Sequence, residues 1–157
     1  RGKTYALAKD SRVFDTGGFK STKTDMTVDD LYAKFLEVFG VARTHCVNMY
    51  GMTELSSQIY DQNLLSYYTD GSSNYLKATP SWVRSVFLDP ATLTPVADGE
   101  QGVIAHYDLA NWNSCLAILT EDLGVRTDSG YELNGRAKGA EARGCSIAVD
   151  EVMAANA

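Results

Sequence analysis

A well-bounded helix between two short strands constrains the fold of this chain more than any other feature. Thr27 is a favoured helix N-cap residue, and Gly40 is the residue type that most often follows the end of a helix. Between them, apolar residues recur at helical spacing: Val28, Leu31, Phe35 and Val38. Strands are expected on either side, over residues 11–16 and 44–49. Strand, helix and strand follow one another so closely that they predict a compact α/β crossover.

The second half of the chain has the pattern of a mostly antiparallel β structure. Strand-like runs alternate with turns rich in Pro, Gly and Asp: residues 82–88, 102–108, 115–120 and a hairpin around 128–130. Short helices are expected over residues 53–58 and, in the Ala-rich final segment, over 147–155. The expected fold class is α/β, with the strand–helix–strand unit followed by a β-rich part and a short C-terminal helix.

We expect the 157 residues to form one continuous unit rather than several domains. Its expected parts are an α/β part over residues 1–65, a β-rich part over 75–135 and a tail over 136–157. The chain opens without a methionine, in a segment with the character of the middle of a domain. We therefore expect it to be a piece of a longer protein.

The charge and cysteine content exclude several classes of function. Fourteen Lys and Arg against twenty Asp and Glu give a net charge of −6, which makes nucleic-acid binding improbable. No run approaches the roughly 18 apolar residues of a membrane span. The three widely spaced cysteines, Cys46, Cys115 and Cys145, argue against a disulfide framework and fit a reducing compartment, so we expect a cytoplasmic protein.

The segment from Asn48 to Glu54 carries the most suggestive chemistry. It lies at the end of an expected strand, where open α/β sheets place ligands. Tyr50 offers an aromatic face, Gly51 lets a ligand approach the backbone, and Thr53 and Glu54 offer a hydroxyl and a carboxylate. These groups suit a planar base, a phosphate and Mg²⁺ bound through water. From residue chemistry alone, a capped helix after a buried strand is an alternative interpretation.

The run Tyr-Gly-Met-Thr-Glu over residues 50–54 resembles the Tyr-Gly-x-Thr-Glu signature of the adenylate-forming enzymes, which include acyl-CoA synthetases and luciferases. Further landmarks of that superfamily occur in the right order: Gly17-Gly18, Gly99-Glu100-Gln101-Gly102, Thr120-Glu121-Asp122 and Gly135-Arg136-Ala137-Lys138. Each landmark alone is weak evidence. Their order along the chain is strong evidence, and it implies the fold of an adenylate-forming enzyme.

Three longer stretches are similar to the acyl-protein synthetases, the family of the long-chain-fatty-acid–luciferin-component ligases of bacterial luminescence: residues 107–111, 120–124 and 135–146. The resemblance covers nearly the whole chain and corresponds to the C-terminal portion of that family. It implies a bacterial ligase that uses ATP and Mg²⁺ to convert a long-chain fatty acid to acyl-adenylate. The acyl group would then move to a cysteine thiol, and a partner, an acyl reductase or acyl-acceptor protein, would receive it.

The resemblance also implies roles for single residues around the nucleotide. The ring of Tyr50 would stack on adenine, close to the backbone of Gly51. The backbone of Gly17-Gly18 would line the adenine pocket. Asp122 would bind the ribose hydroxyls, and Arg136 would lie near the ribose or the hinge. Thus the cofactor-binding candidates come from segments far apart in the sequence.

The candidate catalytic residues implied by the resemblance are Thr53, which would contact the α-phosphate, Glu54, which would help hold Mg²⁺, and Cys145, which would accept the acyl group. Arg143 precedes Cys145 and an expected helix start follows it, and a cationic neighbour and a helix N-terminus both lower the pKa of a thiol. A small buried residue in a turn is the alternative for Cys145. Cys46 and Cys115 are expected in the core.

The two histidines, His45 and His106, lie in strand-like runs without a spaced partner. We expect them to be structural, with His106 the better candidate for a base. We expect the tyrosines at positions 60, 67, 68 and 75 either to line an acyl channel or to pack under a long loop.

Two departures from the superfamily pattern bear on function. No Ser/Thr/Gly-rich phosphate loop precedes Tyr50, so we expect the chain alone to be inactive. We expect no further catalytic domain after Arg136, which agrees with a tail that itself offers the thiol. Two alternatives remain open: an acyl- or aryl-CoA ligase of the phenylacetate-CoA ligase type, and a non-catalytic nucleotide-binding or scaffold module.

Overall fold

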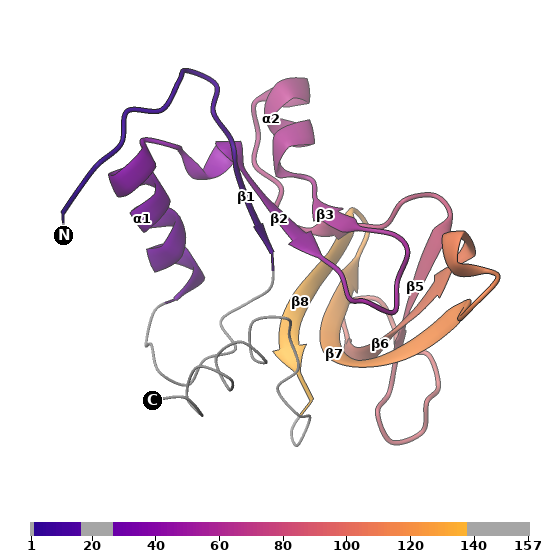
Figure 1. The fold of residues 1–157 in the computed structure, drawn as a ribbon. Coiled ribbons are helices and arrows are strands. Elements are labelled where there is room, and N and C mark those ends of the chain that lie inside the picture. Colours follow the sequence, from indigo (N-terminus) through magenta and orange to yellow (C-terminus); the bar gives the residue numbers. More distant parts are fainter. Residues whose placement is uncertain (1, 17–26, 138–157) are drawn as a thin grey trace, which may run out of the picture.

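The computed structural model of the chain describes residues 2–16 and 27–137. The helices and strands follow the chain in this order (Figure 1): β1 (Val13–Thr16), α1 (Val28–Phe39), η1 (Arg43–His45), β2 (Cys46–Tyr50), β3 (Ile59–Asp61), α2 (Asn63–Asp70), β4 (Lys77–Ala78), β5 (Val83–Leu88), β6 (Gln101–Asp108), η2 (Leu109–Asn111), β7 (Ala117–Thr127) and β8 (Gly130–Arg136). The C-terminal helix expected over residues 147–155 lies outside the described residues. Within them, no helix is long and apolar enough to cross a membrane.

Helix α1 forms where the sequence predicts it because its ends carry their own capping groups. Thr27 and Asp30 form a capping box: the Asp30 N–H donates to Thr27 Oγ1 at 3.1 Å, and the Thr27 N–H donates to Asp30 Oδ2 at 2.9 Å. Gly40 has a φ of 66° and its N–H donates to the carbonyl of Leu36. The prediction of a helix bounded by Thr27 and Gly40 is confirmed.

The first half of the molecule is a parallel crossover. Strands β1 and β2 pair in parallel, with Val13 opposite Cys46, and α1 connects them. Tyr32 of α1 is buried with Val41 and Cys46, so one face of the helix packs beside the two strands. Figure 1 shows α1 next to β1 on the side away from the β-rich strands. The predicted α/β crossover is confirmed.

The second half is a run of antiparallel strands that joins the same sheet. The strand order is β1-β2-β3-β4-β8-β7-β6-β5, and every pairing except β1 with β2 is antiparallel. One apolar cluster fills the β-rich part: Leu55, Ile59, Val83, Phe87, Ile104 and Tyr131. The predicted fold class, α/β followed by mostly antiparallel β structure, is therefore confirmed for the described residues.

One expected helix and the expected burial of Cys115 are wrong, and one strand begins later than expected. Residues 53–58 form turns and bends rather than a helix, and β3 and helix α2 follow where neither was expected. The strand expected from residue 44 begins at Cys46, because Arg43–His45 form a 3₁₀ turn that contains His45. Cys115 is exposed rather than in the core, because β7 begins only at Ala117. Cys46 is buried, as expected.

Candidate functional site

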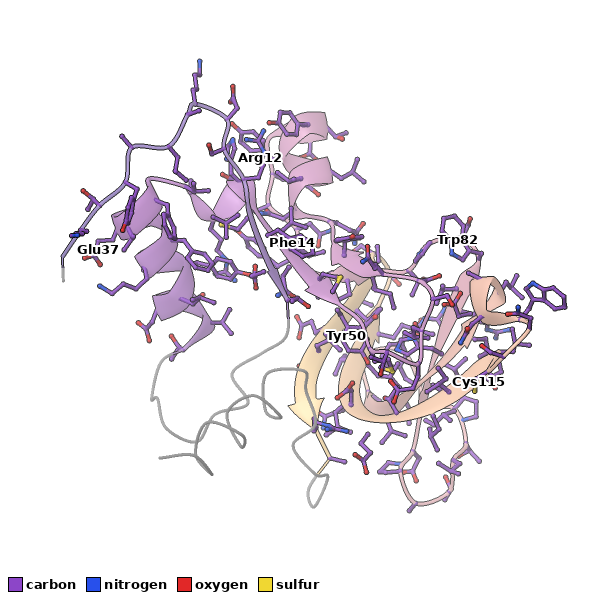
Figure 2. The ribbon with its side chains drawn as sticks, in the orientation of Figure 1. Arg12, Phe14, Glu37, Tyr50, Trp82 and Cys115 are labelled. Atoms are coloured by element: carbon purple, nitrogen blue, oxygen red, sulfur yellow. The ribbon has the colours of Figure 1, made fainter. Side chains whose placement is uncertain are left out.

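Tyr50, the last residue of β2, lies at the junction between the crossover and the β-rich strands (Figure 2). Its hydroxyl donates a hydrogen bond of 2.8 Å to Asp122 Oδ2 on β7. Burial is the main cause that raises the pKa of Tyr50, and the neighbouring Asp122 carboxylate adds to it. The phenol therefore keeps its proton and acts as a donor. A residue of the sequence motif and a residue far along the chain thus share one hydrogen bond.

Arg136, at the end of β8, lies next to the same carboxylate. Its Nε is 3.4 Å from Asp122 Oδ1, and its Nη2 is 2.6 Å from Glu121 Oε2. The side chains of Arg136 and Asp122 are 24% and 21% exposed, so both remain accessible to a ligand. The structure therefore brings together Tyr50, Asp122 and Arg136, which are three of the residues that the sequence singled out.

A β-bulge contributes to this arrangement. Asp122 pairs with Arg136, and Gly124 pairs with Leu133, so β8 carries one extra residue between these two pairs. Gly135 lies in this extra stretch and has a φ of 87°. Bulges turn side chains and occur often beside functional sites. Here the bulge sits directly before Arg136, at the point where that residue meets Asp122.

The loop that follows Tyr50 presents Gly51, Thr53 and Glu54 to solvent. The Thr53 hydroxyl donates to Glu54 Oε2 at 3.1 Å, so the two polar groups of the motif lie side by side. An exposed hydroxyl and carboxylate in contact are available to a phosphate and to a metal ion bound through water. Among residues 2–16 and 27–137, no group of three or more His, Cys, Asp and Glu side chains is arranged to hold a metal ion.

The last residue of β6 and the 3₁₀ turn η2 that follows it hold this loop in place. The buried Asp108 carboxylate accepts hydrogen bonds from the N–H and the hydroxyl of Ser57, at 2.9 and 2.8 Å. Asn111 Nδ2 donates to the carbonyls of Glu54 and Cys115. Asp108 and Asn111 were noticed in the sequence only as part of a resemblance. Their supporting role depends on contacts with residues more than fifty positions away, which no local pattern reveals.

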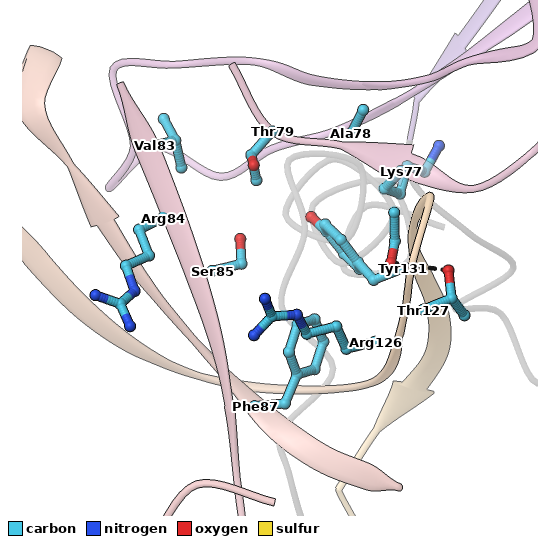
Figure 3. Close-up of a pocket in the computed structure, with 11 residues that line it drawn as sticks. Lys77, Ala78, Thr79, Val83, Arg84, Ser85, Phe87, Arg126, Thr127 and Tyr131 are labelled. Carbon is cyan, nitrogen blue, oxygen red and sulfur yellow. Dashed lines mark hydrogen bonds between the residues drawn. The ribbon is translucent and has the colours of Figure 1, made fainter. Parts of the chain in front are cut away.

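A separate pocket of about 350 Å³ lies between β4, β5, β7 and β8, and the hydroxyls of Thr79, Ser85 and Tyr131 point toward one another in it (Figure 3). The Tyr131 hydroxyl is buried and, although Ser85 lies nearby, it has no hydrogen-bond partner among the described residues. Neither Tyr50 nor Asp122 lines this pocket. It is therefore distinct from the place where the predicted nucleotide-binding residues meet.

Three of the predicted site residues cannot be placed beside Tyr50. Gly17, Gly18 and Cys145 lie outside the described residues. The expected adenine-lining glycines and the expected acyl acceptor therefore remain predictions from the sequence.

Two structural comparisons establish the fold. The chain is similar to apo MatB from Rhodopseudomonas palustris, with a TM-score of 0.53 and 19% identity, over 81% of this chain and 26% of that one. It is also similar to a long-chain-fatty-acid-CoA ligase (FadD1) from Archaeoglobus fulgidus, with a TM-score of 0.50 and 17% identity, over 88% of this chain and 30% of that one. The chain thus has the fold of a part of the adenylate-forming enzymes.

Sequence comparisons identify a narrower group. Two relatives are named long-chain-fatty-acid–luciferin-component ligase: one from Aliivibrio fischeri, 26% identical over 89% of this chain and 37% of the relative, and one from Vibrio harveyi, 22% identical over 99% of this chain and 41% of the relative. The chain therefore spans about two fifths of the length of these curated relatives. Residues 1–154 match the family model described as "Acyl-protein synthetase, LuxE". The chain belongs to this acyl-protein synthetase family.

Proposed function

We propose that this chain is part of an ATP-dependent ligase that activates a long-chain fatty acid as acyl-adenylate and transfers the acyl group to a protein cysteine. The observation that carries the proposal is the contact of Tyr50 with Asp122 and of Asp122 with Arg136. The family match and the names of the two relatives support a fatty acid as the substrate.

The residues around Asp122 fit the ribose and base of an adenine nucleotide. Asp122 uses one oxygen for the Tyr50 hydroxyl, and a carboxylate has about four lone-pair positions, so it can still accept from the ribose hydroxyls. Arg136 balances the charge of this carboxylate. The ring of Tyr50 offers an apolar face to the adenine. Gly51, which follows Tyr50, leaves the backbone open to the nucleotide.

Thr53 and Glu54 face solvent in the same loop and fit the phosphates. We assign Thr53 to the α-phosphate and Glu54 to Mg²⁺, which supplies charge neutralisation during the attack of the fatty-acid carboxylate. The carboxylate forms the new bond to the α-phosphorus, and pyrophosphate leaves. The products of this step are acyl-adenylate and pyrophosphate.

Cys145 completes the second step. Its thiolate attacks the acyl carbonyl of the adenylate, the bond to the phosphate oxygen breaks, and AMP leaves with the electron pair. The thioester on Cys145 then passes the acyl group to a partner, an acyl reductase or acyl-acceptor protein. We propose that this reaction takes place in the cytoplasm, as the reducing environment suggested by the cysteine content implies.

The experiment gives radiolabelled palmitate and ATP to the full-length protein that contains this chain. Label that stays on the protein, is released by hydroxylamine and is lost in Cys145→Ser supports the proposal. Soluble acyl-CoA formed with coenzyme A, without label on the protein, contradicts the cysteine step and favours a CoA ligase. Failure of the chain to bind AMP at millimolar concentration contradicts the nucleotide site and favours a non-catalytic scaffold module. The 157-residue chain alone is expected not to form acyl-adenylate.

A further inference from the structure

His106 is a fully buried histidine of β6 that connects the β-rich core with Tyr50. Its Nδ1 lies 2.8 Å from the Ser85 hydroxyl on β5, and its Nε2 lies 3.4 Å from the Tyr50 hydroxyl. The rings of Tyr50 and His106 also pack together, with centroids 5.6 Å apart. Burial lowers the pKa of His106 to about 4, against the opposing effect of Asp122 and Asp108. The imidazole is therefore neutral at pH 7.

Asp122, Tyr50, His106 and Ser85 are joined by hydrogen bonds in series, and the donor of each bond follows from the carboxylate of Asp122. The Asp122 carboxylate, beside Arg136, only accepts, so the Tyr50 hydroxyl must give it its single proton. The Tyr50 oxygen must then accept a proton from His106 Nε2. A neutral imidazole protonated at Nε2 has a bare Nδ1, which accepts from the Ser85 hydroxyl. All three bonds therefore point from Ser85 toward Asp122.

We propose that His106, as its Nε2–H tautomer, is a positioning residue for the nucleotide site. Its Nε2–H donates to the Tyr50 oxygen, so the Tyr50 hydroxyl donates its own proton to Asp122. The two bonds together fix the orientation of the aromatic ring. Groups that are already ordered lose less conformational freedom when a ligand binds. Bonds aligned in one direction also strengthen one another. The inference rests on the proposed role of Tyr50 and Asp122 toward a nucleotide.

The tautomer is tested first, by ¹⁵N NMR of the chain labelled at its two histidines, because this measurement needs no enzymatic activity. His45→Gln assigns the remaining signals to His106. The expected result is a protonated Nε2 and an unprotonated Nδ1 from pH 8 to pH 5, with loss of this signature in Ser85→Ala. Protonation at Nδ1, or at both nitrogens in this range, would overturn the proposal.

The second measurement is the dissociation constant for AMP, determined by calorimetry in a double-mutant cycle of His106 and Tyr50. His106→Gln is expected to weaken AMP binding about tenfold, which corresponds to about 1.4 kcal/mol. In a Tyr50→Phe background the same substitution is expected to have no further effect, because His106 acts through the Tyr50 hydroxyl. His45→Gln is the control, since it removes the other histidine, which contacts Thr44 and the ring of Tyr67 rather than Tyr50.

The outcomes separate this proposal from the proposed function. If His106→Gln weakens AMP binding equally with Tyr50 and with Phe at position 50, His106 does not act through the Tyr50 hydroxyl. The proposed nucleotide site is then kept and only the role of His106 is wrong. If His106→Gln does not fold, Ser85→Ala takes its place in the cycle, with an expected loss of about threefold. If the unmodified chain and its full-length parent bind no AMP, the nucleotide function is wrong and His106 has no nucleotide to serve, whatever its tautomer.

Discussion

Gly51 is a residue whose identity the fold does not explain. Its φ lies outside the left-handed region, and an added Cβ would meet only Met49 Cε, at an ordinary distance of 3.8 Å. Neither backbone conformation nor packing therefore requires glycine between Tyr50 and the exposed Thr53. The remaining physical reason for glycine is the close approach of a ligand to the backbone. This argument supports the proposed nucleotide contact independently of the resemblance.

Gly51→Ala is therefore expected to separate stability from binding. The free energy of unfolding, measured with urea, should change by less than about 1 kcal/mol, because the added methyl group fits. The dissociation constant for AMP should rise about tenfold, equivalent to about 1.4 kcal/mol. Gly99→Ala is the control: its φ of 86° makes the substitution strained, so stability should fall while AMP binding is kept. Unchanged AMP binding in Gly51→Ala would contradict the proposed site.

His106 also predicts how stability depends on pH. Its pKa is about 4 in the folded protein and about 6.5 when unfolded, so between these values the unfolded state binds more protons. The contribution of the neutral His106 to the free energy of unfolding is then fully present above about pH 6.5. It decreases as the pH falls toward 4, by up to about 3 kcal/mol.

Urea unfolding at several pH values between 7 and 4 measures this dependence. The contribution of His106 is the difference in slope between the unmodified chain and His106→Gln, because carboxylates elsewhere titrate equally in both. A slope that His106→Gln leaves unaltered would show that this histidine is not buried in its neutral form.

At the scale of elements, the sequence predicted those structures whose signals are local. Thr27 as the N-cap, the apolar spacing that follows it and Gly40 predicted α1 correctly. The expected helix over residues 53–58 is wrong because long-range contacts use that backbone instead: the Ser57 N–H donates to Asp108, and the Glu54 carbonyl accepts from Asn111. The relay through His106 was equally hidden, since Tyr50 lies 56 positions away from it. The resemblance, and not any spacing, singled out Asp122 and Arg136.

The curved strands of the β-rich part depend on close backbone contacts that only glycine allows. A Cβ on Gly124 would lie 2.7 Å from the Glu132 carbonyl oxygen and 2.9 Å from atoms of Ile104 and Phe87. Glycine inside a strand often marks such an approach. The register shift between β7 and β8 lies between Gly124 and Asp122, and Asp122 pairs with Arg136. The packing of Gly124 therefore affects the positions of these two site residues as well as the core.

Gly124→Ala is expected to lower the free energy of unfolding by about 1–3 kcal/mol, because the rigid backbone and two buried side chains cannot all move aside. Chemical denaturation measures the loss. Gly51→Ala serves again as the matched control, because its added methyl group meets no such obstacle. A stability of Gly124→Ala equal to that of the unmodified chain would mean that β7 and β8 lie farther apart than the structure shows.

At the scale of the whole molecule, a buried lysine joins the two halves. Lys77 of β4 is 5% exposed, and its ammonium donates to the carbonyl and to the side-chain oxygen of Asn48 on β2. Burial lowers the pKa of Lys77, and the carboxylates of Asp61 and Asp15 oppose this effect. Asn48 in turn donates to Asp15 and, through its backbone, to Asp61. The crossover and the β-rich part therefore share one charged, partly buried network centred on Lys77.

This network predicts that the chain unfolds as one cooperative unit and that Lys77→Met divides it. Removing the ammonium leaves the Asn48 oxygens without their donor and the half-buried carboxylates of Asp15 and Asp61 without a nearby cation, which costs about 1–3 kcal/mol. Both tryptophans, Trp82 and Trp112, lie in the β-rich part, whereas helices α1 and α2 lie outside it. Tryptophan fluorescence and far-UV circular dichroism should therefore follow one urea transition in the unmodified chain and two in Lys77→Met.

Lys34→Met is the matched control, because it removes an exposed lysine that pairs with Glu37 within α1. Its two transitions should coincide, with a change in stability below about 0.5 kcal/mol. Coincident transitions in Lys77→Met would mean that the apolar contacts of the sheet, rather than the charged network, couple the halves. Because Tyr50 comes from one half and Asp122 from the other, a loss of this coupling should also weaken AMP binding, although Lys77 touches neither residue.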